Sequence, residues 1–288
     1  MTLQPLKGTR LVTLALNVPG PVAAARLVEL GTEAIKVEPP SGDPLKLAAR
    51  AFYDLLSQRQ TVVALDLKSK VDRRRLDQSL EKADLLLTSF RPSALKRLQL
   101  DWERLHARHP RLCVVNMIGY PPPDEELPGH DLTYQAKLGL LRPPQLPITL
   151  HADMAGAERA VNVSLALLMN FSRTGQAECA YVSLYDAMRD FARPLTAGLT
   201  AAGGSLGGGF PFYGVYKTSD GWIAVAALEP GFIQRMIEEL NLTANTHAEL
   251  EKIFRTRSAA EWEQWAKERD LPIVAVVRAI IYLPNQTL

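Results

Sequence analysis

Residues 9–40, TRLVTLALNVPGPVAAARLVELGTEAIKVEPP, alternate between two kinds of local pattern. The run at 9–16 is short and apolar, which predicts a buried strand. The Ala-rich run at 19–31 begins with Pro-Gly-Pro and ends with a glycine, which is typical of a helix and its C-terminal cap. A second apolar strand is expected at 33–40, where two prolines stop it. This stretch therefore predicts a strand–helix–strand unit.

The same alternation continues to about residue 120. Strand candidates lie at 61–69, 84–90 and 111–119, and helix candidates lie at 69–83 and 92–100. Strands that alternate with helices form a mostly parallel sheet with helices on both faces. We therefore expect an α/β, Rossmann-like fold for this part of the chain.

The pattern changes after residue 130. A long, mostly apolar helix is expected at 154–175, and 177–191 is interpreted as a strand that continues into a helix. Residues 200–210 are rich in glycine and other small residues, which is typical of a linker. Within them, LGGGF at 206–210 follows no strand, and we interpret it as a hinge.

The last part of the chain has the pattern of a separate domain. Two alternating runs flank Ser219-Asp220-Gly221, and Asp-Gly is a strong turn signal for a β-hairpin. Helices are expected after it at 230–241, 247–256 and 259–268. The sequence thus predicts a large α/β domain at 1–200 and a smaller α+β domain at 205–288.

The composition argues against several classes of protein. The 288 residues are 47% hydrophobic and 22% charged, as in a globular protein with a full core. A formal charge of +2 indicates no polyanionic partner, and Arg73-Arg74-Arg75 stands among acidic residues as a solvated helix face, so no nucleic acid is expected. No apolar run approaches a membrane span, and the first residues lack a signal-peptide layout, so no membrane partner is expected. Cys113 and Cys179 follow no disulfide pattern, which favours a cytoplasmic protein.

Parallel sheets of this kind bind ligands beyond the carboxyl ends of their strands. The loops expected to carry a site contain Asn17, the stretch from Pro39 to Asp43, Lys68, Arg91 and residues 120–130. None of these loops is a G-x-G-x-x-G or Walker loop, which argues against a nicotinamide dehydrogenase or a P-loop enzyme.

Two histidines stand close to an aspartate. His130 directly precedes Asp131, and His151 lies two residues before Asp153. From residue types alone both pairs are ambiguous, because an aspartate at a helix start is most often a cap. No spacing of His or Cys matches a metal-ligand pattern, so no metal site is expected.

Several stretches resemble family III CoA transferases and α-methylacyl-CoA racemases, the CaiB/BaiF-like superfamily. In chain order they are LKGTRLVTLALNVPGPVAAARLVELGTEAIKVEPPSGDP at 6–44, LDLKS at 65–69, ADLLLTSFRPSALKRLQLDWERLHARHPRL at 83–112 and FSRTGQAECAYVSLYDAM at 171–188. The resemblance covers most of residues 6–232. It implies a large CoA-binding domain, a small domain, and two chains interlocked as rings in a homodimer.

Three further motifs are similar to the racemase branch: PGHDLTY at 128–134, LHADMAG at 150–156 and GGFPFYGVYKTSDGWIAVAALEPGF at 208–232. The resemblance implies that His130 and Asp153 act as acid and base on opposite faces of the α-carbon of an acyl-CoA. It implies that Glu229 hydrogen-bonds His130 and that the backbone N–H of Asp131 faces the thioester oxygen. The implied substrate is a 2-methyl or other α-branched acyl-CoA. Coenzyme A is then part of the substrate, and no tightly bound cofactor is expected.

The resemblance also implies a set of CoA-binding residues, namely Lys36, Arg59, Leu67, Lys68 and Arg91. Two departures are expected to weaken CoA binding. Pro39 stands where family members usually have an arginine, and SQRQT at 57–61 replaces a more basic segment. Family members are also longer, with a segment that returns from the small domain to the large one. The sequence ends at IIYLPNQTL without it, which leaves open whether the ring closes.

Two alternatives stay open at this point. In the transferase branch an aspartate near Asp153 forms an acyl anhydride and then a thioester with CoA, so the chain would move CoA between carboxylic acids. The other alternative is a non-catalytic CoA-binding homologue, which the departures at Pro39 and 57–61 favour. His130 distinguishes the racemase from the transferase, because transferases of the family usually lack this histidine.

Overall fold

A computed structural model of the chain describes residues 3–277. The chain forms two compact units, Met1–Ala192 and Arg193–Leu288. The division falls before the glycine-rich stretch 200–210 in which the sequence places the linker. The short helix α10 (Arg193–Thr196) therefore belongs to the second unit.

The first unit is built on one six-stranded parallel sheet in the order β3-β2-β1-β4-β5-β6. This confirms the parallel α/β fold expected from the sequence. Its strands are β1 (Arg10–Thr13), β2 (Glu33–Glu38), β3 (Thr61–Ala64), β4 (Leu85–Thr88), β5 (Cys113–Ile118) and β6 (Cys179–Ser183).

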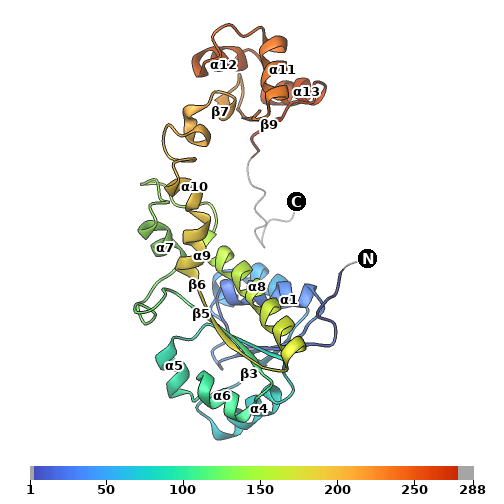
Figure 1. The fold of residues 1–288 in the computed structure, drawn as a ribbon, viewed down its shortest axis with the longest axis vertical. Coiled ribbons are helices and arrows are strands. Elements are labelled where there is room, and N and C mark those ends of the chain that lie inside the picture. The colour runs from blue at the N-terminus through green and yellow to red at the C-terminus, as the bar shows by residue number, and fades with distance from the viewer. Residues whose placement is uncertain (1–2, 278–288) are drawn as a thin grey trace. The chain divides into compact units, whose positions relative to one another are not determined.

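Helices cover both faces of this sheet (Figure 1). The longest of them, α8, starts at His151, three residues earlier than the sequence predicts, so the aspartate of LHADMAG lies in its first turn. The helices are α1 (Pro19–Glu29), α2 (Leu45–Ala48), α3 (Arg50–Ser57), α4 (Lys70–Leu80), α5 (Pro92–Arg97), α6 (Trp102–Arg108), α7 (Asp131–Lys137), α8 (His151–Thr174) and α9 (Leu184–Phe191).

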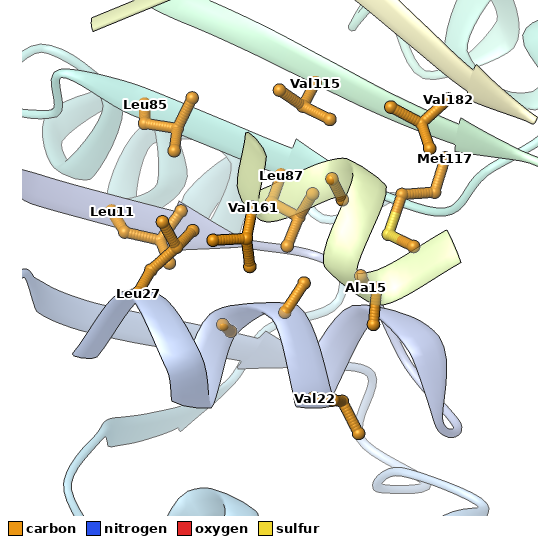
Figure 2. Close-up of a cluster of buried hydrophobic side chains, with 14 of the residues drawn as sticks. Leu11, Ala15, Val22, Leu27, Leu85, Leu87, Val115, Met117, Val161 and Val182 are labelled. Atoms are coloured by element: carbon orange, nitrogen blue, oxygen red, sulfur yellow. The ribbon is translucent and has the colours of Figure 1, made fainter. Parts of the chain in front are cut away.

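Successive residues of the central strands are buried on opposite faces of the sheet. Leu11, Leu85 and Leu87 pack with α1 and α8 in one cluster (Figure 2), whereas Val12 and Leu86 pack in a second cluster with α4, α5 and α6. All five side chains are at most 2% exposed. Because both faces are covered, these strands read as continuous apolar runs rather than as alternating ones.

The second unit contains a three-stranded antiparallel sheet, which confirms the predicted hairpin. β7 (Tyr213–Lys217) pairs with β8 (Trp222–Ala226), and β9 (Ile273–Ala275) pairs with the other side of β8. The three predicted helices are present and pack on one face of this sheet around buried aromatic side chains. They are α11 (Pro230–Leu240), α12 (His247–Phe254) and α13 (Ala259–Lys267).

The glycine-rich stretch that the sequence analysis interprets as a hinge carries a short irregular helix, η1 (Ser205–Gly209). Gly208 has φ 96°, a left-handed conformation that glycine adopts without strain. Gly207 also departs from helical geometry, so the helix is kinked at these two residues.

The strand order creates a crevice in the first unit. The chain moves from β1 outward to β2 and β3 on one side, and from β4 outward to β5 and β6 on the other. The connections that leave β1 and β4 therefore run in opposite directions at the carboxyl edge of the sheet. Such a switch point is where doubly wound sheets bind ligands.

Candidate active site

A cavity of about 160 Å³ lies at this switch point, at the carboxyl ends of β1, β4 and β5. Its wall combines the loops that follow these strands with the start of α7 and the first turn of α8. The polar or ionisable residues that line it are Asn17, Ser89, Arg91, Glu125, His130, Tyr134 and Asp153. The site residues predicted on α7 and α8 therefore meet at the edge of the sheet where a ligand is expected.

His130 is the N-cap residue of α7, and its backbone is extended, with φ −140° and ψ 167°. Thr133, one turn ahead, fixes this geometry. Its hydroxyl accepts the backbone N–H of His130 at 3.0 Å and donates to the His130 carbonyl at 2.8 Å. The backbone of His130 is thus anchored by Thr133, and His130, an exposed residue, lines the cavity.

Asp131 is buried, with 4% of its surface exposed, and its side chain has a role that the sequence analysis did not foresee. One carboxylate oxygen accepts the backbone N–H groups of Ala152 at 2.7 Å and Asp153 at 3.2 Å. The other accepts the amide of Gln135 at 2.6 Å. Asp131 therefore caps α8 as well as opening α7. The contribution of its backbone N–H, which the family resemblance implies, stays a prediction.

Asp153 is the third residue of α8 and lines the same cavity as His130 at the start of α7. Burial raises the pKa of its carboxyl group to about 7, with a further contribution from the negative charge of Asp131. The group is therefore populated in both protonation states near neutral pH. A residue with that property can either donate or accept a proton.

Tyr134 brings a phenol to the same cavity and was not among the predicted site residues. Its ring is 1% exposed and packs edge-on against Tyr120, with 5.0 Å between ring centroids. Two glycines make room for it, because a Cβ at Gly119 would lie 2.5 Å from the Tyr134 hydroxyl oxygen and a Cβ at Gly129 2.5 Å from its ring. Burial is the main cause that raises the pKa of Tyr134, so the phenol stays protonated and remains a hydrogen-bond donor.

A signal for Tyr134 was present in the sequence. Its i, i+4 spacing from His130 places both residues on one side of the start of α7. Glu125 is a second residue that was missed. It lines the cavity, and its Oε2 is buried without a hydrogen-bond partner among residues 3–277. No spacing rule predicts it, because it lies in an irregular loop.

A second cavity, of about 190 Å³, lies beside the first at the carboxyl ends of β2 and β3. Leu67 and Lys68, which follow β3, line it together with Pro39. Leu16 and Phe90 line both cavities, so the two are neighbours along the same edge of the sheet.

The comparison with known families decides where this chain belongs. The family model of CoA-transferase family III matches residues 6–283. The chain belongs to CoA-transferase family III. Among its curated relatives, the α-methylacyl-CoA racemase of Mus musculus is 28% identical over 281 residues, which cover 91% of this chain and 70% of the racemase.

A second relative carries the name of the other reaction. The cinnamoyl-CoA:phenyllactate CoA-transferase of Clostridium sporogenes is 32% identical over 199 residues, which cover 62% of this family III chain and 48% of the transferase. A crystal structure of a hypothetical protein from Mycobacterium tuberculosis has the same fold, with a TM-score of 0.83 at 24% identity. The match covers 96% of this chain and 84% of that protein.

Lys36, one of the residues predicted to contact CoA, lies inside the fold of this family III chain. Its side chain is fully buried, and its ammonium lies 2.6 Å from Asp43 and 3.0 Å from Glu38. The ring of Tyr53 lies 4.5 Å from the same nitrogen. The charge of Lys36 is thus paired with two carboxylates inside the fold. An apolar β-strand pattern does not reveal that this lysine side chain points inward, and its contact with CoA stays a prediction.

Arg59 precedes β3 and therefore lies toward the amino edge of the parallel sheet, away from the two cavities. It lines a different, open groove of about 910 Å³, together with Arg10, Arg75 and Lys82. The other three predicted contacts lie on the carboxyl side, with Leu67 and Lys68 in the second cavity and Arg91 in the first. Their contact with CoA stays a prediction.

Glu229 is the N-cap residue of α11 and belongs to the second unit, so its hydrogen bond with His130 stays a prediction. His151 is the first residue of α8 and is exposed, and it does not line the cavity that contains Asp153. Across residues 3–277, no group of three or more His, Cys, Asp or Glu side chains is arranged to hold a metal ion. In the same part of the chain, no helix has the length and apolar character needed to cross a membrane.

Proposed function

We propose that this family III chain is an acyl-CoA racemase or epimerase that inverts the α-carbon of a 2-methyl or other α-branched acyl-CoA. One observation carries the proposal. His130 and Asp153 line the same cavity from different helices, and the pKa of Asp153 is raised to about 7. The motifs around both residues, which are similar to the racemase branch, support the same conclusion.

The proposed reaction moves one proton off the α-carbon and returns another on the opposite face. The imidazole of His130 removes the α-proton, and the electrons of the broken C–H bond form an enolate of the thioester. Asp153, protonated, then gives its proton to the other face of the carbon. In the reverse direction the Asp153 carboxylate removes the proton and protonated His130 returns it. Each positioned acid or base typically contributes about 10²–10⁴-fold to the rate.

The enolate oxygen needs hydrogen-bond donors, since the α-proton of a thioester is only weakly acidic. The backbone N–H of Asp131, at the first position of α7, is the donor that the family resemblance implies. The phenol of Tyr134, which lines the same cavity, is a second donor in our proposal. Glu229 is proposed to hydrogen-bond His130 from the second unit.

The proposed position of the ligand follows the two neighbouring cavities. The acyl thioester occupies the cavity of His130, and the nucleotide end of CoA extends past Leu16 and Phe90 into the second cavity. Lys68 and Arg91 are the cations proposed to contact its phosphates. We also propose that the chain acts as a homodimer with no tightly bound cofactor. We propose a cytoplasmic location, with which its free cysteines, Cys113 and Cys179, are consistent.

Deuterium exchange tests this function. The protein is incubated with a 2-methylacyl-CoA in D₂O, and deuterium at the α-carbon is followed by NMR or mass spectrometry. We expect exchange in the wild type and its loss in His130→Ala plus Asp153→Ala. The matched control is His151→Ala, which removes an exposed histidine in the same turn of α8 as Asp153 and should leave exchange unchanged. Failure of the wild type to exchange any α-branched acyl-CoA would contradict the proposal.

A CoA transferase is the second candidate, and the 32% identity with a CoA-transferase over 199 residues favours it. In that reaction the Asp153 carboxylate attacks the thioester carbonyl, releases CoA as a thiolate and holds the acyl group as an anhydride. Hydroxylamine would cleave this anhydride, leaving a hydroxamate on one of its two carbonyl groups and a carboxylate on the other. The trapped product should form in His130→Ala as well as in the wild type, whereas racemisation requires His130.

A further inference from the structure

A buried hydrogen-bonded chain leads from α7 to the first turn of α8. Gln135, 2% exposed, donates its side-chain amide to one oxygen of Asp131 at 2.6 Å. The other oxygen of Asp131 receives the backbone N–H groups of Ala152 and Asp153. Both side chains are withdrawn from solvent, and the chain ends at the backbone of Asp153.

We propose that Gln135 and the carboxylate of Asp131 are positioning residues for Asp153, which fix where its side chain enters the cavity and hold a carboxylate beside it. The inference rests on the proposed function, in which Asp153 transfers a proton. It adds to that function because it assigns a role to Gln135 and to the side chain of Asp131, beyond the backbone N–H of Asp131.

Three donors converge on one buried carboxylate. The two backbone N–H groups and the Gln135 amide all donate to the carboxylate of Asp131, and hydrogen bonds from such donors stabilise a negative charge. The two backbone donors also belong to the start of α8, where an anion is stabilised by the helix dipole. The negative charge of Asp131 acts on Asp153 and adds to the effect of burial.

The choice of glutamine at residue 135 has an electrostatic consequence. A lysine or arginine there would also donate to Asp131, but its charge would cancel the charge that acts on Asp153. A neutral amide satisfies the carboxylate oxygen and leaves that charge in place, and this charge adds to the effect of burial in raising the pKa of Asp153. The other titratable or charged groups that face the same cavity are Arg91, Glu125, His130 and Tyr134.

Asp131→Asn is the main test, because it removes the charge and keeps an amide oxygen that can accept the N–H groups of Ala152 and Asp153. The titration of Asp153 is measured in the ligand-free protein by ¹³C NMR of labelled aspartate carboxyls, with the signal assigned through Asp153→Asn. We expect the midpoint to move to lower pH by about one unit, the size typical of removing one close like charge. The matched control is Asp101→Asn, because Asp101 caps α6 in the same way, through the N–H of Arg104.

Gln135→Leu is the second variant, and it tests the positioning role without changing a charge. Loss of the donor to Asp131 should raise the amide hydrogen-exchange rates of Ala152 and Asp153 by about tenfold, the effect of one charge-assisted hydrogen bond. It should also lower kcat for α-proton exchange with little change in KM. The rest of α8 should keep its exchange rates.

The outcomes separate this inference from the proposed function. An unchanged Asp153 midpoint in Asp131→Asn, or unchanged amide exchange in Gln135→Leu, overturns the inference even if the wild type racemises its substrate. A shifted midpoint together with faster amide exchange supports the inference, even if no acyl-CoA tried exchanges its α-proton. In that last case it is the proposed function that fails.

Discussion

Asp153→Asn should make the protein more resistant to unfolding at alkaline pH. Burial and the charge of Asp131 raise the pKa of Asp153 from 3.8 to about 7 in the folded chain. Between these values the folded protein holds a proton that the unfolded chain has released. Stability from this group is therefore greatest in acid and is lost as the pH rises toward 7. Asparagine resembles the protonated carboxyl in shape and has no such proton to lose.

The size of the effect follows from the same shift. Stability falls by about 1.36 kcal/mol for each pH unit in which only the folded carboxyl is protonated. Of the interval from pH 5.5 to pH 8.5, about 1.5 units lie below the folded pKa of about 7. The wild type should therefore lose about 2 kcal/mol more than Asp153→Asn across this interval.

Urea unfolding followed by circular dichroism at both pH values measures this difference. Effects of all other titrating groups are common to the two proteins and cancel in the comparison. Glu103→Gln, which removes an exposed carboxylate from the first turn of α6, is the control and should follow the wild type at both pH values. The reasoning is refuted if the stability difference between wild type and Asp153→Asn is the same at pH 5.5 and pH 8.5.

Three further changes test the fold and the ligand site. Gly129→Ala places a Cβ 2.5 Å from the ring of Tyr134, so we expect a lower Tm, with a cost of about 1–3 kcal/mol, and slower α-proton exchange. Lys36→Met leaves two buried carboxylates without their counter-ion, and urea unfolding should reveal a loss of about 3–5 kcal/mol, whereas no measurable loss would place the lysine elsewhere. Acyl-CoA at 100 times its Kd should stabilise the folded protein by about 2.7 kcal/mol in thermal shift. Lys68→Glu should weaken this effect and Arg59→Glu should not, and the opposite order would contradict the ligand position proposed above.

Much of the first unit could be predicted from the sequence, because its strands are buried on both faces. The runs around Leu11, Leu86 and Val114 have almost no polar residues, and that pattern, interrupted by helices, permits little other than a parallel α/β sheet. The hairpin at Asp220-Gly221 was equally clear, since the turn residues and the flanking alternation agree. These features depend on residues that are close together in the sequence, so they can be predicted without knowledge of the tertiary structure.

The candidate site was only partly predictable, because its remaining parts depend on contacts between distant segments. Asp131 caps a helix that begins 20 residues later in the chain, at His151, and no local rule reports such a contact. Lys36 lies in a strand whose pattern gives no sign of the buried carboxylates that pair with it. Tyr134 enters the cavity because Gly119 and Gly129, at the two ends of the loop between β5 and α7, make room for it. Family motifs located His130 and Asp153, and the three-dimensional packing supplied their surroundings.

The most direct test of the central claim measures each base separately with each enantiomer of a 2-methylacyl-CoA in D₂O. If His130 and Asp153 work on opposite faces, His130→Ala should abolish deuterium uptake from one enantiomer and Asp153→Ala from the other. Neither single variant should convert one enantiomer into the other. Loss of exchange from the same enantiomer in both variants, or inversion that survives either substitution, would contradict the two-base mechanism.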